Sequence, residues 1–592
     1  METSVSAASG LIPDPDSVSP AEVREELARL LASDALIKSA RLSTFLRLTV
    51  ETTLAGQADT LKEFAIGHDV FDRGSDYDPR TDSIVRVEAL RLRRKLNEYY
   101  DGAGSDNPVL ISFQPGSYVP KFARRRHMQP PTESSAADID PDTVAVLPFV
   151  NLSADPEQSL FCSGTTEEII LELASVPDLK VLGLTTSFAL RDTKQDLMAI
   201  CRQLGVGTLV EGTVRKSGDQ LRIGAKTVDV ATGHAVWSRS FDRNLDDIFA
   251  IQDEIAQEVA AALQAPARPI AAFPAGSAGV EAYTWYLKGK YAWDEGSVGP
   301  CLAAGDCFRR SASLAPGFAL PLSGLAYVYQ WMALWGWTRP REAQIESRRA
   351  AQEALRIDNG SSDSHVAWAA HLLRFEWDWK GAEAALDRAV QLNPSNGLAY
   401  SFKANCAIAQ SRFEEGLRFY ERAVHLDPLS YRTNGAMGVP YWLLGQYEEA
   451  ERWLGVAYNL KEDALLTRFF RSRLYLSMGR YEEAIQCSSG LSAQSHLLLG
   501  ALGAAYSAAG NQEKAREILR FLQHQAASQY VEPLAMAAVQ LQLNLRDEAL
   551  DSLQEAVEGR SPMAAFLNID PFYQPLRAEP RFQQLRTALN LS

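Results

Sequence analysis

The chain has 592 residues and a formal net charge of -15, with 46% hydrophobic and 22% charged residues, an ordinary composition for a folded protein of several domains. This acidity argues against a protein that coats nucleic acid non-specifically through its overall charge. Six scattered cysteines without a C-x-x-C pair, a start without a signal-peptide pattern and the absence of any apolar run near 18 residues predict reduced thiols, no membrane span and a cytoplasmic location.

Four helices are predicted in the first part of the chain. Residues 1–19 are rich in proline, serine and aspartate and are expected to be disordered. Apolar residues at helical spacing predict two helices between Pro20 and Gly56 and a short third helix over Thr60–Ile66. The stretch Asp82–Tyr100 predicts a fourth helix with one apolar stripe. The stripe consists of Val85, Ala89, Leu92, Leu96 and Tyr99.

This fourth helix also concentrates positive charge within an acidic chain. Its basic residues lie beside and behind the stripe and are Arg86, Arg91, Arg93, Arg94 and Lys95. One interpretation is a recognition helix that presents cations to a DNA groove. The alternative is a solvated basic face, which is the ordinary role of a charged run on a helix.

A predicted hairpin follows the helix, with strands at Val109–Phe113 and Tyr118–Phe122 and a tight turn at Gln114–Ser117. The strings VRVEALRLRRKL and ISFQPGSYVPKF resemble the OmpR/PhoB-type winged-helix effector domain, over roughly residues 20–126. This resemblance implies a DNA-binding domain there. On that interpretation Arg86, Arg93 and Arg94 face the major groove, whereas Arg91, Lys95 and Lys121 bind phosphate.

Residues 127–141 are a predicted linker, and residues 142–263 a predicted α/β module with a mixed sheet. Its predicted elements are a strand at 144–150, a helix at 164–174 with a threonine cap and an acidic first turn, a strand at 179–184, a helix at 196–204, strands at 208–215, 221–229 and 235–241, and a packing helix at 246–263. The strings VAVLPFVNLSADPE and LGVGTLVEGTVRKSGDQLRIGAKTVDVATGHAVWSRSFDR resemble the TolB-amino-terminal-like module. The resemblance implies a regulatory setting and no known chemistry.

Residues 264–280 form a second predicted linker, and residues 281–592 a helical repeat array that ends in a capping helix. Aromatic residues recur every 34 positions, at Trp379, Phe413, Tyr447 and Tyr481. Small residues recur with the same step, at Ala382, Gly416, Ala450 and Ala484. Helix-turn-helix units of this length, with small residues where helices cross, resemble tetratricopeptide repeats. Six to eight repeats are expected.

No pattern of catalytic residues stands out. Gly205-Val-Gly207 lacks the third glycine of a dinucleotide loop, and no phosphate-binding loop, zinc-protease or serine-hydrolase motif is present. The paired acids Glu167 and Glu168 fall in the first turn of a predicted helix, where the positive end of the helix dipole stabilises their negative charges. We therefore expect no enzymatic activity, no catalytic residue, no metal and no cofactor.

The sequence thus predicts a multidomain protein: an N-terminal winged helix, a central α/β module and a C-terminal all-α repeat solenoid. The predicted function is a cytoplasmic transcription regulator that binds double-stranded DNA, with a repeat array that binds a protein or peptide partner or self-associates as a homodimer. Two alternatives stay open. One is an interaction scaffold in a signalling pathway that does not bind DNA, and the other is an unrecognised enzyme in the α/β module.

Overall fold

The chain is described here from a computed structural model. The structure describes residues 18–33, 36, 39–71, 84–100, 104, 107–113, 118–124, 139–153, 158–176, 179–191, 196–217, 220–244, 248–263 and 277–591. Most of the predicted disordered start, the hairpin turn at 114–117 and most of both predicted linkers lie outside these residues. The chain divides into two compact units, residues 1–135 and 136–592, and each is described by itself.

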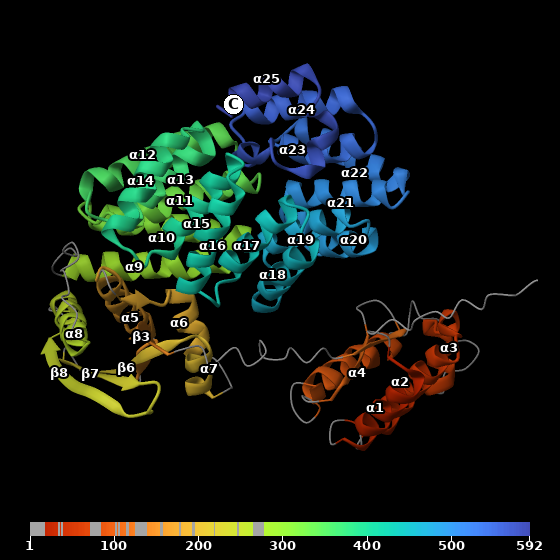
Figure 1. The fold of residues 1–592 in the computed structure, drawn as a ribbon, viewed down its shortest axis with the longest axis horizontal. Helices are drawn as coiled ribbons and strands as arrows, with labels where there is room; N and C mark the ends of the chain where they lie inside the picture. The colour runs from red at the N-terminus through yellow and green to blue at the C-terminus, as the bar shows by residue number, and fades with distance from the viewer. Residues whose placement is uncertain are drawn as a thin grey trace, which may run out of the picture. The chain divides into compact units, whose positions relative to one another are not determined.

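The first unit contains helices and one antiparallel hairpin (Figure 1). Its elements are α1 (Pro20–Ala32), α2 (Ala40–Leu54), η1 (Ala58–Thr60), α3 (Glu63–Phe71), α4 (Ile84–Tyr100), β1 (Val109–Phe113) and β2 (Pro120–Arg124). Ser19 begins α1 with a capping box: its hydroxyl accepts from the Glu22 amide, and the Glu22 carboxylate accepts from the Ser19 amide. The third helix begins later than predicted, since Ala58–Thr60 forms a separate 3-10 turn. The apolar stripe of α4 is buried against α1, α2, α3 and β1, as predicted.

The second unit begins with a six-stranded mixed sheet. Strand β3 pairs in parallel with β5 and β6, β4 pairs in parallel with β6, and β6, β7 and β8 form an antiparallel meander. The elements are β3 (Asp140–Val146), β4 (Val150–Asn151), α5 (Gln158–Ala174), β5 (Lys180–Val181), α6 (Leu184–Arg191), α7 (Leu197–Gln203), β6 (Val206–Ser217), β7 (Gln220–Asp229), β8 (Ala235–Asn244) and α8 (Ile248–Ala262). The predicted mixed sheet is confirmed. The predicted strand at 179–184 is shortened to two residues, because α6 begins at Leu184.

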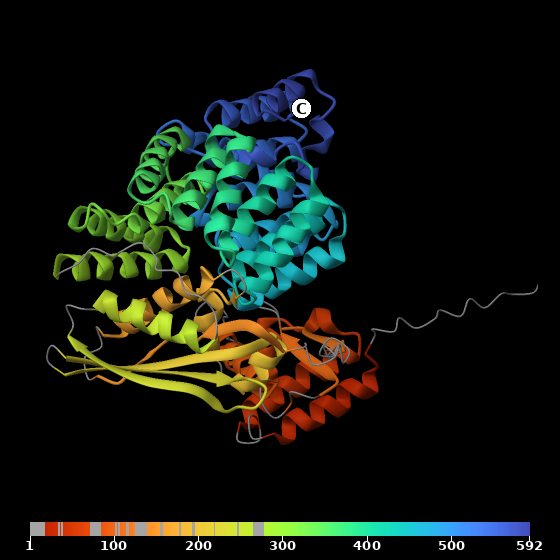
Figure 2. The same cartoon turned by 60° about the vertical axis from the view of Figure 1, so that its left-hand side comes forward.

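The two faces of this sheet are covered differently because side chains alternate along each strand. Helices α5 and α8 pack on one face, against Val144, Val210 and Ile223. Helices α6 and α7 cover part of the other face, against Ala145 and Leu209. Figure 2 shows α5 (orange) and α8 (yellow) between the yellow strands and the green helices of the repeat region. The sheet therefore meets the repeats through its helices.

The repeat region consists of antiparallel helix pairs from residue 277 onward and resembles a tetratricopeptide-repeat solenoid. Its elements are α9 (Ser277–Glu295), α10 (Val298–Leu314), α11 (Leu320–Leu334), α12 (Pro340–Ile357), α13 (Ser362–His371), η3 (Leu372–Glu376), α14 (Trp379–Leu392), α15 (Gly397–Ala409), α16 (Phe413–Leu426), α17 (Tyr431–Leu443), α18 (Tyr447–Leu460), α19 (Leu465–Ser477), α20 (Tyr481–Ser489), η4 (Ser492–Gln494), α21 (His496–Ala508), α22 (Gln512–Ala526), α23 (Pro533–Gln542), α24 (Arg546–Glu558), η5 (Pro562–Phe566), η6 (Pro571–Leu576) and α25 (Pro580–Ala588).

The 34-residue pattern has a direct structural cause. Each aromatic residue of the series is the first residue of the second helix of a pair, in α14, α16, α18 and α20. The small residue three positions later lies where that helix crosses the first helix of the same pair. At Gly416 an added Cβ would lie 2.5 Å from Ile408 Cγ1 and 3.3 Å from the Ala404 carbonyl oxygen. The predicted helix crossings are confirmed at this position.

The turns inside the pairs follow the same period. One residue in the turn after the first helix has a left-handed backbone: Trp377, Ser411, Gly445, Gly479 or Asn544. All five positions fall in the turn that separates the two helices of a pair, at 34-residue steps from 377 to 479. A left-handed residue ends a helix by redirecting the chain. Sequence reasoning missed this marker because the residue type varies from one repeat to the next.

Two glycines ten positions apart test this explanation. An added Cβ meets no atom within 4 Å at either Gly445, which has φ +74°, or Gly455, which lies inside α18. We expect Gly445→Ala to destabilise the array by roughly 1–2 kcal/mol through backbone strain alone. Gly455→Ala should stabilise it by about 0.5–1 kcal/mol, since alanine favours a helix interior. Urea unfolding of both variants measures the two effects, and equal signs would contradict the assignment of the turn.

The array closes on its own C-terminal segment, defined as residues 559–591. The backbone carbonyl of Leu589 accepts from Trp379 Nε1 at 3.1 Å, and Asn590 donates to the Trp377 carbonyl at 3.2 Å. Near the same end, Arg341 in α12 donates to the Glu558 carbonyl at 2.6 Å. In Figure 1 the blue C-terminal helices accordingly lie beside the green helices α12 and α13. Contacts between residues more than 200 positions apart in sequence thus join α12 and the start of α14 to the C-terminal end of the array.

Candidate functional site

Of the six cations predicted to contact DNA, three have side chains within the described residues. The side chains of Arg86, Arg93 and Arg94 lie outside the described residues. The exposed Arg91 guanidinium pairs with Glu88 on the same helix at 2.7 Å. Lys95 is half-buried in α4, and Lys121 is exposed on β2. An exposed pair such as Arg91–Glu88 is typical of a solvated helix face.

The paired acids Glu167 and Glu168 have a different position from the one predicted. Helix α5 begins at Gln158, so both acids lie in its interior and not in its first turn. Both are buried. The interpretation as dipole-satisfying acids is therefore wrong, and the error came from placing the start of the helix at Gly164. Their environment is the contact between the sheet module and the first repeat, which we name the seam.

Charged and phenolic groups hold the seam together. The Glu167 carboxylate forms an ion pair with Lys290 of α9 and accepts from the Tyr286 hydroxyl at 3.3 Å. The Glu168 carboxylate accepts from the Tyr283 hydroxyl at 3.2 Å. Burial lowers the pKa of Lys290, but the charge and hydrogen bond of Glu167 outweigh it, and the pKa is raised overall. The ammonium form of Lys290 is thus the one that the seam stabilises.

The turns between repeats form the other half of the seam. The Ser395 hydroxyl, in the turn after α14, donates to the Leu179 carbonyl at 3.1 Å. One repeat later, Asp427 accepts from the amide and the hydroxyl of Thr186, at 2.9 and 2.6 Å. The amide of Gly183 donates to the Leu426 carbonyl at 2.6 Å. Equivalent turns of two successive repeats therefore bind the start of α6 and the strand before it.

A cavity of about 310 Å³ lies within the seam, and we name it the seam cavity. Acidic side chains outnumber basic ones on its wall. The acids are Glu167, Asp294, Asp363 and Asp427, and the bases are Lys290 and Arg432. Arg432 pairs with Asp294 at 3.0 Å, as Lys290 does with Glu167. Burial raises the pKa values of Asp363 and Asp427. Cavities between domains are common sites for small ligands.

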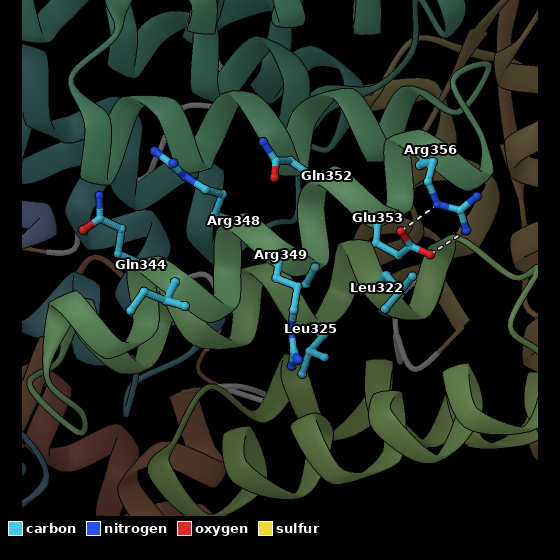
Figure 3. A pocket seen from close by; sticks show the side chains of 10 residues that line it. Leu322, Leu325, Gln344, Arg348, Arg349, Gln352, Glu353 and Arg356 are labelled. Carbon is cyan, nitrogen blue, oxygen red and sulfur yellow. Dashed lines mark hydrogen bonds and ion pairs between the residues drawn. The ribbon is translucent and has the colours of Figure 1, made fainter.

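A second opening lies on the repeat region itself, between α11 and α12, and we name it the α11–α12 groove. It has a volume of about 900 Å³ and is lined by Leu322, Leu325, Gln344, Ile345, Arg348, Arg349, Ala350, Gln352, Glu353 and Arg356. Figure 3 shows Arg349 extending from α12 toward Leu325 on α11, and the ion pair between Glu353 and Arg356. Ile345 is 66% exposed although it is aliphatic. Ile345 lies outside the alanine-rich buried stripe of α12. An aliphatic residue outside that stripe is a signal in the sequence that could have indicated this surface.

The inner surface of the repeat region, by contrast, is occupied by the chain itself. Met563 and Phe566 of the C-terminal segment border a residual cavity of about 110 Å³ together with Trp331, Phe402 and Trp442, which belong to α11, α15 and α17. Arg473 of α19 pairs with Asp570 at 2.9 Å, with side chains only 6% and 14% exposed. The C-terminal segment therefore covers the surface formed by the first helices of the pairs.

Within the described ranges, no group of three or more histidine, cysteine, aspartate or glutamate side chains could hold a metal ion. All six cysteines are free, and five of them are buried. None of the helices that the structure describes is both long enough and apolar enough to cross a membrane. The seam cavity and the α11–α12 groove are thus the two candidate sites for binding.

Comparison with known proteins gives one curated relative. The chain is 31% identical over 323 residues to "Putative adenylate cyclase 3" of Rhizobium meliloti (strain 1021), and the match covers 51% of this chain and 54% of the relative. The chain thus spans about half the length of that relative. A match of 323 residues is longer than the first unit and must include residues of the second. No model of a known protein family matches the chain.

Solved structures with a similar arrangement of helices include several repeat proteins. Human IFIT1 in a dimer with m7Gppp-AAAA has a TM-score of 0.38 and 13% identity, covering 57% of this chain and 78% of that one. A tetratricopeptide repeat protein from Parabacteroides merdae has a TM-score of 0.30 and 14% identity, covering 45% and 100%. Yeast Tom70 has a TM-score of 0.33 and 14% identity, covering 53% and 69%.

These findings correct two predictions made from the sequence. The predicted DNA-binding transcription regulator is wrong, because the relative is named for a cyclase and nothing in the comparisons points to DNA. The prediction that the chain is not an enzyme is wrong on the same ground. The physical source of the first error is the weight given to one basic helix, whose described exposed arginine is neutralised by its own neighbour.

Proposed function

We propose that the chain is an interaction scaffold in a signalling system of the adenylate-cyclase type, and that its repeats bind a protein partner. In this proposal residues 281–592 are tetratricopeptide repeats, residues 142–263 are a TolB-like module, and residues 20–126 are a winged helix that serves as a protein-interaction module. The name of the relative supports the signalling setting. Stacked repeats provide the extended surface that such proteins use for binding.

The observation that carries the proposal is the exposed α11–α12 groove. The inner surface is filled by Met563, Phe566 and their neighbours, so a partner that leaves the fold intact has to bind elsewhere. The groove offers an opening of about 900 Å³ with an exposed aliphatic side chain, Ile345. An exposed apolar residue rimmed by charged ones is a common feature of protein interaction sites.

The charges of the groove indicate what kind of partner it fits. Its arginines are more exposed than the acids that pair with them: Arg348, Arg349 and Arg356 are 48%, 74% and 70% exposed, whereas Glu376, Glu346 and Glu353 are 20%, 35% and 42% exposed. The groove therefore presents positive charge outward even though each arginine has a partner. We propose an acidic segment with one apolar anchor, since complementary charge selects the partner and the anchor supplies affinity.

Replacing Ile345 tests this surface. We expect Ile345→Glu to reduce partner recovery roughly tenfold or more, because losing one buried aliphatic side chain costs about 1.5–3 kcal/mol. Tagged full-length chain is used for capture from cells that express it, and the bound proteins are quantified by mass spectrometry. Val236→Glu is the matched control, since Val236 is 69% exposed but lies on the sheet module. Equal recovery with both variants and the unaltered chain would contradict the groove as the partner site.

An enzymatic activity is the second candidate, and the name of the relative is the observation that favours it. Purified full-length chain incubated with ATP and Mg²⁺ or Mn²⁺ tests it directly, with cyclic AMP measured as product. Product formation above the level of a heat-inactivated sample would establish the enzyme. Absence of product, together with groove-dependent capture of a partner, would support the scaffold.

A further inference from the structure

We infer that a third cavity, the one that the C-terminal segment leaves on the inner surface of the repeats, binds a short-chain monocarboxylate through Arg374 and the aromatic side chains around it. We name it the inner cavity, and its volume is about 110 Å³. This inference goes beyond the proposed partner binding and does not depend on it, because the inner cavity and the α11–α12 groove share no lining residue.

Arg374 brings a positive charge to the inner cavity that no carboxylate of the described chain neutralises. Its side chain is partly buried and lines the cavity. Its polar contacts are a long hydrogen bond of 3.4 Å to the Gln330 amide oxygen and the face of the Phe402 ring, whose centre lies 5.1 Å from the guanidinium carbon. Among the residues that the structure describes, no carboxylate lies within ion-pair distance of Arg374. A cation withdrawn from water without a counter-ion is costly, so this position favours an anion from outside the protein.

The charge balance of the cavity points to a ligand with one negative charge. Burial lowers the pKa of Arg374 to about 10, and the groups that oppose this shift are the phenols Tyr327 and Tyr420, so the guanidinium is still charged at neutral pH. The acid on the described wall of the cavity is Asp570, which pairs with Arg473 at 2.9 Å. One positive charge is therefore left in excess.

A second donor lies beside this cation. Asn405 also lines the inner cavity, and its amide oxygen accepts from the Tyr420 hydroxyl at 2.9 Å. Within the described ranges its NH₂ group donates to no side chain or carbonyl, so its two hydrogens are left for a ligand. Burial raises the pKa of Tyr420 and the charge of Arg374 lowers it, which places the guanidinium near that hydroxyl and its Asn405 partner. An oxygen anion at this end of the cavity can accept from both side chains.

The backbone that carries Arg374 is irregular. Arg374 is the middle residue of η3, which is a π-helical turn that follows α13 directly. The first helices of the next pairs, α15, α17 and α19, have no such turn, so the stacking of repeats does not require it. Single π-helical turns are rare and occur frequently at functional sites. The turn thus sets this repeat apart at the residue that faces the cavity.

The remaining walls decide between an inorganic anion and an organic one. They are mainly aromatic and aliphatic and include Trp331, Phe402, Trp442, Phe470, Met563 and Phe566. Such walls favour contact with an alkyl chain and disfavour the second charge of a phosphate or sulfate ion.

The size of the cavity limits the length of that chain. An apolar cavity of about 150 Å³ holds benzene, so the volume of about 110 Å³ matches a chain of about four carbons. The fork of an arginine can pair with both oxygens of a carboxylate. A monocarboxylate the size of butanoate therefore fits both the charge and the walls.

Occupancy would hold the C-terminal segment on the repeats. Met563 belongs to η5 of that segment, whereas Arg374 and Asn405 belong to η3 and α15 of the array. A ligand that binds only the closed array stabilises it by mass action. The carboxylate would thus act as a signal that stabilises closure of the array.

Titration calorimetry on the full-length chain tests the inference with sodium butanoate as the probe. We expect saturable binding of butanoate and no binding of 1-butanol or 1-butylamine, which have the same chain without the negative charge. Sodium sulfate at equal ionic strength should neither bind nor displace butanoate. Sulfate binding as strong as that of butanoate would overturn the inference, since the cavity would then accept any anion.

Two variants change the charge at the site. Arg374→Met removes the cation and should weaken butanoate binding at least tenfold. Since Arg374 has no carboxylate partner, this variant should unfold in denaturant much as the unaltered chain does. Asn405→Asp keeps the acceptor for the Tyr420 hydroxyl but places a negative charge where the donor was, and it should also weaken binding at least tenfold.

Arg452→Met is the control for non-specific attraction of anions, because Arg452 is 56% exposed and lies outside the inner cavity. It should leave butanoate binding unchanged. No measurable binding of butanoate would overturn the inference. Equal binding to the unaltered chain, to Arg374→Met and to Asn405→Asp would overturn it as well, since the attraction would then belong to the surface.

Discussion

Replacing Lys290 by methionine is expected to loosen the sheet module from the first repeat. The substitution leaves Glu167, whose side chain is only 6% exposed, without its counter-ion in the seam. Removal of one partner of a buried ion pair costs about 3–5 kcal/mol, because the remaining charge is neither solvated nor paired. Hydrogen exchange of the full-length chain measures the effect, and the amides of α5 and α9 should exchange faster.

A control for this experiment lies two positions away on the same helix. Lys288 is exposed and contacts the ring of Trp285 at 4.9 Å. Lys288→Met removes the same charge and should leave the exchange of α5 unchanged. The seam would not depend on the ion pair if Lys290→Met and Lys288→Met gave the same exchange pattern.

Replacing Arg473 by methionine should release the C-terminal segment from the inner surface of the repeats. The Arg473 guanidinium pairs with the Asp570 carboxylate, whose side chain is 14% exposed, and lies 4.1 Å from the centre of the Phe572 ring. We expect a loss of about 3–5 kcal/mol in the free energy of unfolding, as for other buried pairs that lose one member. Denaturant unfolding measures the loss, and exchange should rise first in η5, η6 and α25.

An exposed ion pair on the same array provides the comparison. Arg452 and Glu449 pair at 2.8 Å on α18, with side chains 56% and 47% exposed. Arg452→Met should cost less than about 1 kcal/mol, since water screens and solvates both charges. A loss for Arg473→Met as small as that for Arg452→Met would mean that Asp570 does not hold the C-terminal segment.

Features with a short period were predictable from the sequence. The 34-residue recurrence of aromatic and small residues predicted the helical repeats and their helix crossings, because each repeat has the same local packing. The strands predicted at 208–215, 221–229 and 235–241 likewise correspond to β6, β7 and β8. The apolar stripe of α4 was also correct.

Features that join distant parts of the chain were not predictable. Glu167 and Lys290 are 123 residues apart, and Thr186 and Asp427 are 241 residues apart. Neither pair has a local pattern, and an acid at position 167 looks the same whether it begins a helix or lies buried inside one. The closure of the array by residues 559–591 has the same character, since nothing periodic marks the contact of Trp379 with Leu589.

The functional prediction failed for a related reason. A run of basic residues such as that of α4 can have several physical roles, and the role depends on which residues surround each basic side chain. The acid that pairs with Arg91 was visible at position 88, but its significance depends on side-chain geometry. The two candidate binding sites, in the seam and between α11 and α12, are built from residues that no motif connects.

The central claim is that a protein partner binds at the α11–α12 groove while the C-terminal segment keeps the inner surface filled. Hydrogen exchange of the full-length chain, alone and with its captured partner, tests this most directly. We expect new protection in α11 (Leu320–Leu334) and α12 (Pro340–Ile357), with exchange in residues 559–591 unchanged. Protection that appears on the inner helices α15, α17 and α19, with faster exchange in residues 559–591, would contradict the claim.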